Sequence, residues 1–228
     1  MNRTLEFDEL FKKNINHYSK HKQMIPFVGK YWGQYKKLLI IGESHYLPKE
    51  SDKGMIKNWY KLTSEQLSED EYWWTATAEL LDIAGKNQVY KSKGHLIWKN
   101  IELAMIESGF NLKEKSNMFQ YVSYMNFFQK PAQNTGDSII YNDEDVIFAN
   151  TILKDVCSII KPEYIFFVSS KAYSVSESID NTTIGHSCHP SCRWWNMKSK
   201  SYSFATTKKP LTGKESFIKF LQKYNILV

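Results

Sequence analysis

The stretch Lys37-Leu38-Leu39-Ile40-Ile41-Gly42 decides the fold, because four consecutive large apolar residues run directly into a glycine. A continuous apolar run of this length is typical of a strand that is buried on both faces of a parallel sheet. Residues 121–127 and 162–169 have the same β-branched and aromatic character, and residues 182–186 show it more weakly. The sequence therefore predicts a central sheet of four parallel strands.

Segments with helical periodicity separate these strands. An apolar pattern at residues 98–105 stops at Gly109, and another runs from the acidic residues 142–145 to Pro162. Strands that alternate with helices require crossover connections, which place helices on both faces of the sheet. We therefore expect an α/β fold, a three-layer α/β/α sandwich around the four-stranded parallel sheet.

The chain is 228 residues long, a length typical of a single domain, so we expect one domain that spans residues 1–228. Residues 47–93 are rich in lysine and hold no convincing strand, although residues 69–85 form a candidate helix. We interpret residues 47–93 as an insertion that lies over one face of the domain.

The cysteine content and the distribution of apolar residues indicate the cellular compartment. Three cysteines, Cys157, Cys188 and Cys192, are too few for a disulfide framework and are typical of a reduced protein. The first eight residues include acids where a secretory signal would have its apolar core. No apolar run approaches the roughly 20 residues that a membrane helix needs. The sequence thus predicts a cytoplasmic, monomeric protein without a membrane segment.

Charge and aromatic content favour a nucleic-acid partner. Thirty Lys and Arg against 24 Asp and Glu give a net charge of +6, and aromatic residues make up 15% of the chain. Cations bind phosphates, and flat rings stack on exposed bases. The alternative is a solvated surface around a core rich in aromatic rings.

The polar segments of the chain follow the predicted strands. In parallel α/β sheets the ligand lies outside the carboxyl ends of the strands. The segments that leave the first, second and fourth predicted strands are residues 42–46, 126–131 and 186–193, and they hold most of the candidate catalytic side chains. We therefore expect a functional site at this edge of the sheet.

These segments carry a resemblance to a known family. Gly42-Glu43-Ser44-His45-Tyr46 resembles the first motif of the uracil-DNA glycosylase superfamily, and His189-Pro190-Ser191 is similar to the second. The strand that reaches Asn126 is similar to the one whose asparagine reads the extruded uracil, and a helix from Trp98 to Gly109 has a counterpart in one branch. The resemblance extends over nearly the whole chain apart from residues 47–93.

The resemblance implies a DNA glycosylase that flips uracil, or a related deaminated or damaged base, out of DNA and hydrolyses its N-glycosidic bond. His189 would donate to the carbonyl oxygen on which negative charge develops. Asn126 would pair with the edge of the base, because an amide offers a donor and an acceptor in one plane. Glu43 would position water and offset the charge of the sugar cation.

Other residues receive supporting roles from the same resemblance. Gly42 and Tyr46 would lie against the base, and Tyr46 would crowd the pyrimidine 5-position. Ser44 and Ser191 would bind flanking phosphates. The ring that stacks on the base would be Tyr90. The side chains that fill the gap in the duplex would come from Arg193, Trp194 and Trp195, with the alternative that one of the two tryptophans belongs to the core.

The sequence departs from the family pattern at two positions. Ser44 stands where one branch has the aspartate that activates water, and His45 stands where the motif has proline. We therefore count His45 and Ser44 among the catalytic candidates with Glu43 and His189, with His45 as a substitute base. No cofactor is expected, because an iron–sulfur cluster of the family needs four cysteines. The spacing of His186, Cys188 and Cys192 does not match a zinc site.

Two alternatives remain open. The same fold could recognise a modified base in DNA without cutting it, which the changes at Ser44 and His45 favour. An unrelated α/β hydrolase could act on a small molecule with Glu43, His45 and His189, and this alternative predicts a deep apolar pocket without a basic rim.

Overall fold

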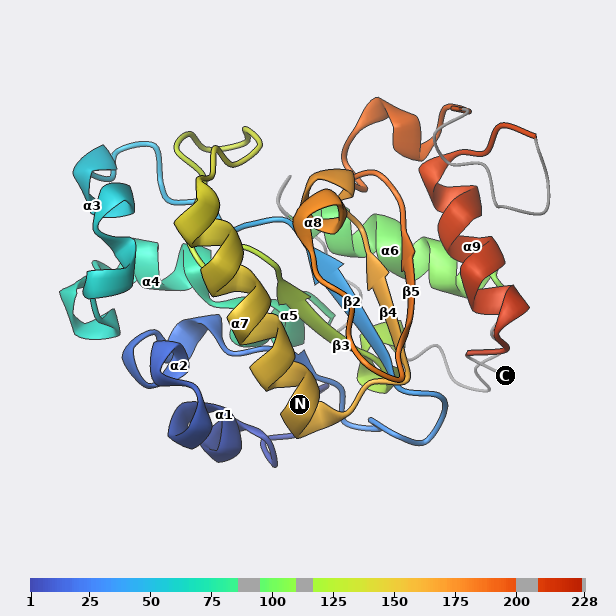
Figure 1. Cartoon of the computed structure of the whole chain (residues 1–228), viewed down its shortest axis with the longest axis horizontal. Coiled ribbons are helices and arrows are strands. Elements are labelled where there is room, and N and C mark those ends of the chain that lie inside the picture. The colour runs from blue at the N-terminus through green and yellow to red at the C-terminus, as the bar shows by residue number, and fades with distance from the viewer. Residues whose placement is uncertain (86–94, 110–116, 200–208, 227–228) are drawn as a thin grey trace.

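The computed structural model describes residues 1–85, 95–109, 117–199 and 209–226. Its centre is a mixed sheet of five strands in the order β1-β3-β2-β4-β5 (Figure 1). The strands are β1 (Phe27–Val28), β2 (Leu38–Gly42), β3 (Ser123–Asn126), β4 (Tyr164–Phe167) and β5 (Thr183–His186). The last four are mutually parallel, and β1 pairs antiparallel with β3 at the edge.

The predicted four-stranded parallel sheet is therefore wrong in strand number and in being purely parallel. The extra strand, β1, holds only two residues, Phe27 and Val28. A pair of apolar residues is too short to show the periodicity by which strands are recognised in a sequence. The expected strand at each of the other four places is present, with ends that differ from the expected ones by at most two residues.

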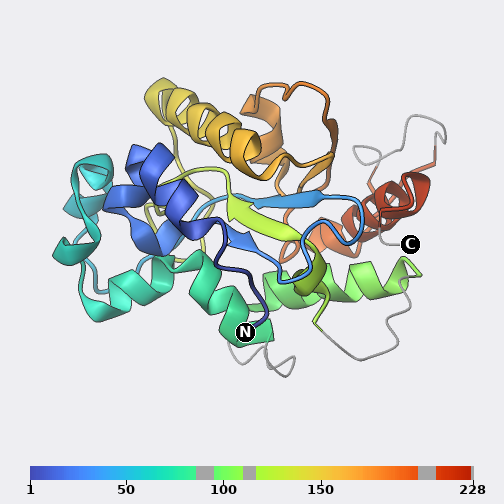
Figure 2. The ribbon, with the colours of Figure 1, turned by 90° about the horizontal axis from the view of Figure 1, so that it is seen from below.

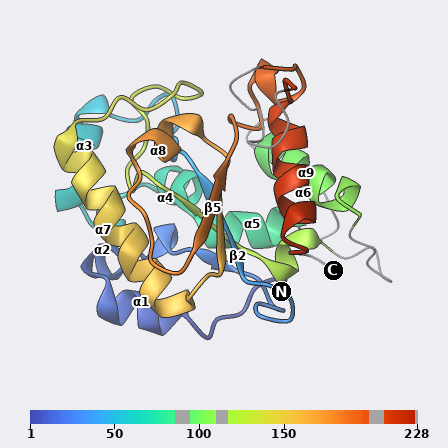
Figure 3. The same ribbon diagram turned by 45° about the vertical axis from the view of Figure 1, so that its right-hand side comes forward.

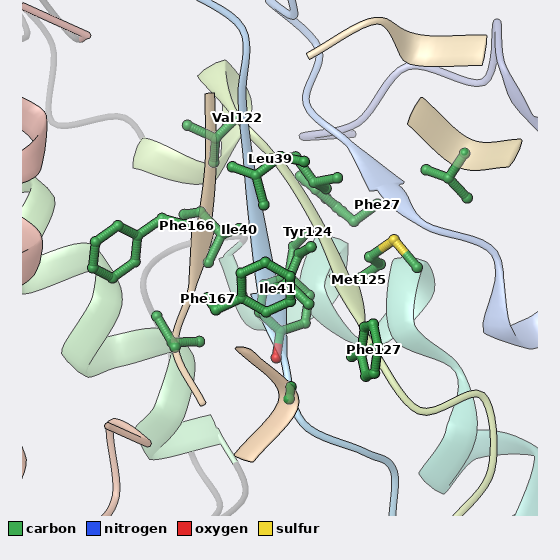
Figure 4. Close-up of a cluster of buried hydrophobic side chains, with 14 of the residues drawn as sticks. Phe27, Leu39, Ile40, Ile41, Val122, Tyr124, Met125, Phe127, Phe166 and Phe167 are labelled. Atoms are coloured by element: carbon green, nitrogen blue, oxygen red, sulfur yellow. The ribbon is translucent and has the colours of Figure 1, made fainter. Parts of the chain in front are cut away.

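The sheet is buried on both faces. All five residues of β2 are buried, which accounts for the continuous apolar run in the sequence. On one face Phe166 packs against Phe217 and Phe220, with ring centroids 4.6 and 5.0 Å apart. On the other face Phe167 meets Phe127 at 6.0 Å. Figure 4 shows Phe127, Phe166 and Phe167 among the side chains gathered along the central strands.

Helices lie on both faces of the sheet (Figure 2). One face carries α7 (Asp143–Ile160) and α8 (Ser170–Val175), and α1 (Asp8–Asn14) packs against α7. The other face carries α5 (Thr77–Gly85), α6 (Leu96–Glu107) and α9 (Gly213–Lys223). Helices α6 and α9 pack side by side beyond β5 (Figure 3).

Local sequence signals account for the bounds of α7. The Asn142 side chain accepts from the Asp145 amide, and the Asp145 side chain accepts from the Asn142 amide, so the first turn is capped in both directions. The helix ends at Ile160, because the next residue, Lys161, has a φ of 49° and is followed by Pro162. This agrees with the sequence-based expectation that a helix runs from the acidic residues to the proline.

The remaining helices are short. They are α2 (Asn16–Lys20), α3 (Lys53–Lys57) and α4 (Glu69–Thr75), together with 3-10 turns that include η2 (Trp59–Lys61), η5 (Met118–Tyr121) and η6 (Arg193–Trp195). The single helix expected over residues 69–85 is two helices, because Ala76 has a ψ of 82° and breaks the helical path. Within the described ranges, no helix has both the length and the apolar character to cross a membrane.

Candidate functional site

The candidate site lies at the carboxyl ends of the parallel strands. Gly42 at the end of β2 is the register partner of Asn126 at the end of β3, so the segments after these strands leave the sheet together. The loop after β5 returns to the same edge, where Asn100 of α6 donates from Nδ2 to the carbonyl oxygen of Pro190 at 2.8 Å. Helix α6 therefore holds the loop that carries His189.

Hydrogen bonds fix the carboxylate of Glu43. Its Oε1 accepts from Ser138 Oγ at 2.5 Å and from the Ile139 amide at 3.2 Å, and its Oε2 accepts from Ser169 Oγ at 2.8 Å. A carboxylate has about four acceptor positions, so Oε2 keeps one that these donors do not use. The side chain is half-buried. Glu43 is thus oriented, with an acceptor position left for water.

The His189 imidazole has a defined tautomer. Its Nδ1 lies 2.7 Å from Ser191 Oγ and accepts from the Ser191 amide at 3.4 Å. Since an amide nitrogen can only donate, Nδ1 is the acceptor and the proton of the neutral ring lies on Nε2. Burial lowers the pKa of His189 below its usual value, and the nearby Glu43 carboxylate opposes this shift in part. At neutral pH, His189 therefore offers an N–H donor without a positive charge.

Asn126 belongs to a tightly packed group with Gly42 and Tyr124. The Tyr124 hydroxyl lies 3.2 Å from Asn126 Oδ1. A Cβ atom on residue 42 would lie 2.2 Å from that hydroxyl oxygen and 2.3 Å from Oδ1. Only glycine leaves room here, so the glycine at the end of β2 is required by the close approach of the two β3 side chains.

Tyr46 lies within electrostatic reach of both Glu43 and Tyr124. It is half-buried and packs against the core. Burial raises its pKa, and the negative charges of Glu43 and Asp137 raise it further. Tyr46 in turn lies close enough to Tyr124 to raise the pKa of that residue, after the larger effect of burial. The structure thus brings Gly42, Glu43, Tyr46 and Asn126 together at one strand edge, with His189 within electrostatic reach of Glu43.

His45 has a different environment from its sequence neighbours. It is 5% exposed, and its Nε2 lies 2.6 Å from Thr77 Oγ1 of α5. Burial, with a smaller effect of His21, lowers the pKa of His45 to about 3. The imidazole that we counted as a substitute base is therefore a neutral interior group bonded to Thr77. Ser44 beside it is half-buried.

The residues after His189 divide between surface and core. Ser191, a predicted phosphate ligand, has its hydroxyl bonded to His189. The Arg193 guanidinium is exposed and stacks 4.6 Å from the Trp194 ring. Trp195 is 1% exposed and belongs to the core. Tyr90, the predicted stacking ring, lies outside the described residues.

Sequence reasoning missed several residues of this site. Ser169 ends the third predicted strand at the same edge of the sheet. It could have been found by the strand-end rule, which is that ligands bind outside the carboxyl ends of parallel strands. Tyr124 is two residues before Asn126 and therefore shares its face of the strand, a signal that the period of two supplies. Asn100 and Ser138 gave no signal, because their contacts join residues that are distant in the sequence.

A cavity of about 280 Å³ lies beside the site, between the start of the 47–93 segment and the loop after β3. It is lined by Lys49, Lys53, Asn134 and Thr135 over an apolar floor that includes Ile56. Neither Glu43 nor His189 lines it.

Within the part of the chain that the structure describes, no three His, Cys, Asp or Glu side chains are arranged to hold a metal ion. His186 instead stacks face to face on Tyr173, with centroids 3.8 Å apart. Cys188 is buried against the position of Gly213, where a Cβ atom would lie 2.5 Å from its sulfur. Comparison with models of known protein families and with curated proteins gives no match for this sequence.

Proposed function

We propose that this chain binds DNA and hydrolyses the N-glycosidic bond of an extruded uracil or a related deaminated or damaged base. The observation that carries the proposal is the state of His189. Its pKa is lowered, its Nδ1 is occupied by Ser191, and its Nε2–H is left as a neutral donor near Glu43.

Such a donor suits the departure of a pyrimidine base. When the bond between the base and C1′ breaks, its electron pair goes to the base, and negative charge develops on a carbonyl oxygen. An N–H group already aimed at that oxygen stabilises the charge without reorganisation, and such donors contribute about 10²–10³-fold in rate. Because the N–H group of a neutral imidazole is a very weak acid, His189 stabilises this charge by a hydrogen bond and keeps its proton.

Glu43 supplies the matching group on the sugar side. Its remaining acceptor position can bind a water molecule, and its negative charge offsets the developing positive charge of the sugar. The oxygen of that water bonds to C1′ as the base leaves, and a proton passes from the water to the carboxylate. Ser138 and Ser169 hold the carboxylate in place for this role.

The surface around the site fits a DNA partner. The chain has a net charge of +6, and the exposed Arg193, which stacks on the half-buried Trp194, follows directly after the His189 loop. A cationic flat group of this kind is suited to enter a duplex where a base has been extruded. The lysines that line the neighbouring cavity, Lys49 and Lys53, provide cations for flanking phosphates.

A DNA-binding protein of the same fold that does not cut is the second candidate. The observation that favours it is the burial of His45 against Thr77, together with Ser44 in place of the water-activating aspartate. In this case Asn126 and His189 would hold a base without the hydrolytic step.

Incubation of the full chain with uracil-containing single- and double-stranded oligonucleotides tests both candidates. We expect abasic product from the wild type, and its loss in the His189→Ala and Asn126→Ala variants. Salt-sensitive binding of the uracil oligonucleotide over a matched thymine control, without product, would select the binding protein instead. Neither product nor preferential binding at any salt concentration would reject both.

A further inference from the structure

The Asn126 side-chain amide can recognise two different kinds of base edge, depending on its orientation. An asparagine amide can turn by 180° about its Cβ–Cγ bond, which exchanges its donor and its acceptor. An amide free to turn can therefore pair with a base edge that carries a carbonyl or with one that carries an amino group. Discrimination between these edges requires something that fixes the amide.

Trp98 and Tyr124 form the relay that can fix it. The Trp98 and Tyr124 rings meet edge to face at 6.2 Å, and Trp98 lowers the pKa of Tyr124 against the larger effect of burial, as an N–H donor near the hydroxyl oxygen would. An indole nitrogen can only donate, so this neighbour leaves the hydrogen of the Tyr124 hydroxyl to be donated elsewhere. That hydrogen points to the amide of Asn126, 3.2 Å away, which must present its oxygen.

Packing keeps the relay in one arrangement. Tyr124 is 3% exposed, and burial raises the pKa of its hydroxyl, which therefore keeps its hydrogen. On the opposite side, Gly42 contributes only a backbone, against which the tyrosine oxygen and Asn126 Oδ1 lie too closely for any larger residue. The buried Tyr124 ring therefore keeps its hydroxyl in place, and the hydrogen bond holds Oδ1 of the half-buried Asn126.

We infer that Tyr124 is a specificity-determining positioning residue, which locks the Asn126 amide so that the site accepts bases with a carbonyl edge and rejects those with an amino edge. The inference rests on the proposed function, which it deepens.

The chemistry of the locked amide defines the substrate class. With Oδ1 bonded to Tyr124, the Nδ2 hydrogens face a ligand, and one lone pair of Oδ1 remains beside them. This pattern matches a carbonyl oxygen next to a ring N–H, as in uracil and other deaminated bases. A cytosine-like edge places an amino group where the carbonyl would be, and two donors then oppose each other.

Tyr124→Phe tests the lock, because phenylalanine keeps the buried ring and removes only the hydroxyl. Tyr18→Phe is the matched control, since Tyr18 is fully buried and its hydroxyl has no hydrogen-bond partner in the described structure. We would measure excision from otherwise identical oligonucleotides with uracil or cytosine at one position. We expect Tyr124→Phe to lower the uracil-to-cytosine ratio of kcat/KM by about 10-fold or more, and Tyr18→Phe to leave it unchanged.

Hydrogen exchange at the Trp98 indole N–H supplies a readout independent of activity. We expect Tyr124→Phe to accelerate this exchange and to shift the side-chain amide resonances of Asn126, whereas Tyr18→Phe affects neither. A wild type that excises uracil, with an unchanged ratio in Tyr124→Phe, would overturn the inference. If the wild type neither excises nor binds any base, only the proposed function is rejected. In that case, unchanged Trp98 exchange and unchanged Asn126 resonances in Tyr124→Phe would show that Tyr124 does not fix the Asn126 amide.

Discussion

The Ser191 hydroxyl lies 2.7 Å from Nδ1 of His189, two residues before it in the chain. This contact makes Ser191 the group that orients the imidazole and keeps its proton on Nε2. The Pro190 carbonyl between them is held by Asn100, so the short loop after β5 presents the ring from a fixed backbone.

Removal of the Ser191 hydroxyl should weaken catalysis and spare binding. Ser191→Ala leaves the backbone amide as the only partner of Nδ1, and the ring loses one neutral hydrogen bond, worth about 1 kcal/mol. We expect kcat to fall about 5- to 10-fold, with DNA affinity unchanged within twofold. The control is Ser158→Ala on the exposed face of α7, whose hydroxyl bonds only to a backbone carbonyl. An unchanged kcat in Ser191→Ala would remove the orienting role.

Loss of the imidazole should cost more than loss of its partner. His189→Ala deletes the donor to the leaving base, and removal of such a donor costs about 3–4 kcal/mol in transition-state stabilisation. We expect kcat to fall by about 10²–10³-fold while the variant still retains uracil-containing DNA. Equal loss of DNA affinity and rate would instead mean that His189 acts in binding.

Glu43→Gln should lower the rate of hydrolysis, because it keeps the size of the side chain and removes its negative charge. The amide group of glutamine donates where the carboxylate accepts, so it opposes one of the hydroxyl donors and carries no charge for the sugar cation. We expect a fall in kcat of at least about 10²-fold, with a smaller loss of folding stability, about 1–3 kcal/mol. Glu163→Gln, at an exposed acid that accepts from the Lys37 amide, is the control. Full activity in Glu43→Gln would contradict a role for the carboxylate.

Acid should unfold the protein through its buried histidines. Burial lowers the pKa of His45 to about 3 and that of His21 to about 4, both below their usual 6.5. Between these values and 6.5 the unfolded chain binds protons that the folded chain does not, so stability falls as pH falls. Each such group contributes up to about 1.4 kcal/mol per pH unit.

Urea unfolding at pH 7.5, 6 and 5 measures this dependence. We expect stability at pH 5 to be lower than at pH 7.5 by roughly 2 kcal/mol for each of the two histidines, and we expect His45→Gln to show a smaller change between pH 7.5 and pH 5 than the wild type. A flat stability profile from pH 7.5 to 5 would show that these imidazoles are not held neutral in the interior.

Gly42→Ala should disrupt the group around Asn126. The added methyl would overlap the Tyr124 hydroxyl and Asn126 Oδ1, and overpacking of this kind costs about 1–3 kcal/mol. The double variant with Tyr124→Phe should regain part of the lost stability, because this substitution removes one of the two overlapping atoms. Additive effects of the two substitutions in chemical unfolding would contradict this close packing of Gly42, Tyr124 and Asn126.

The strand-end rule explains how much of this site the sequence could predict. It located Glu43, Asn126 and His189, because apolar runs mark parallel strands and their polar exits share one edge. It could not tell that His45 turns inward to Thr77, since loop residues lack the periodicity that assigns a side chain to a face. It also missed β1, whose two residues form a strand only because β3 pairs with them.

The most direct test of the account is a single-turnover reaction, with the full chain in excess over an oligonucleotide that holds one uracil, followed by mass analysis of the released base. We expect free uracil in an amount equal to the abasic product, with a rate that falls by about 10²-fold or more in His189→Ala. DNA retained on the wild type without release of any base, or equal release by the wild type and His189→Ala, would contradict it.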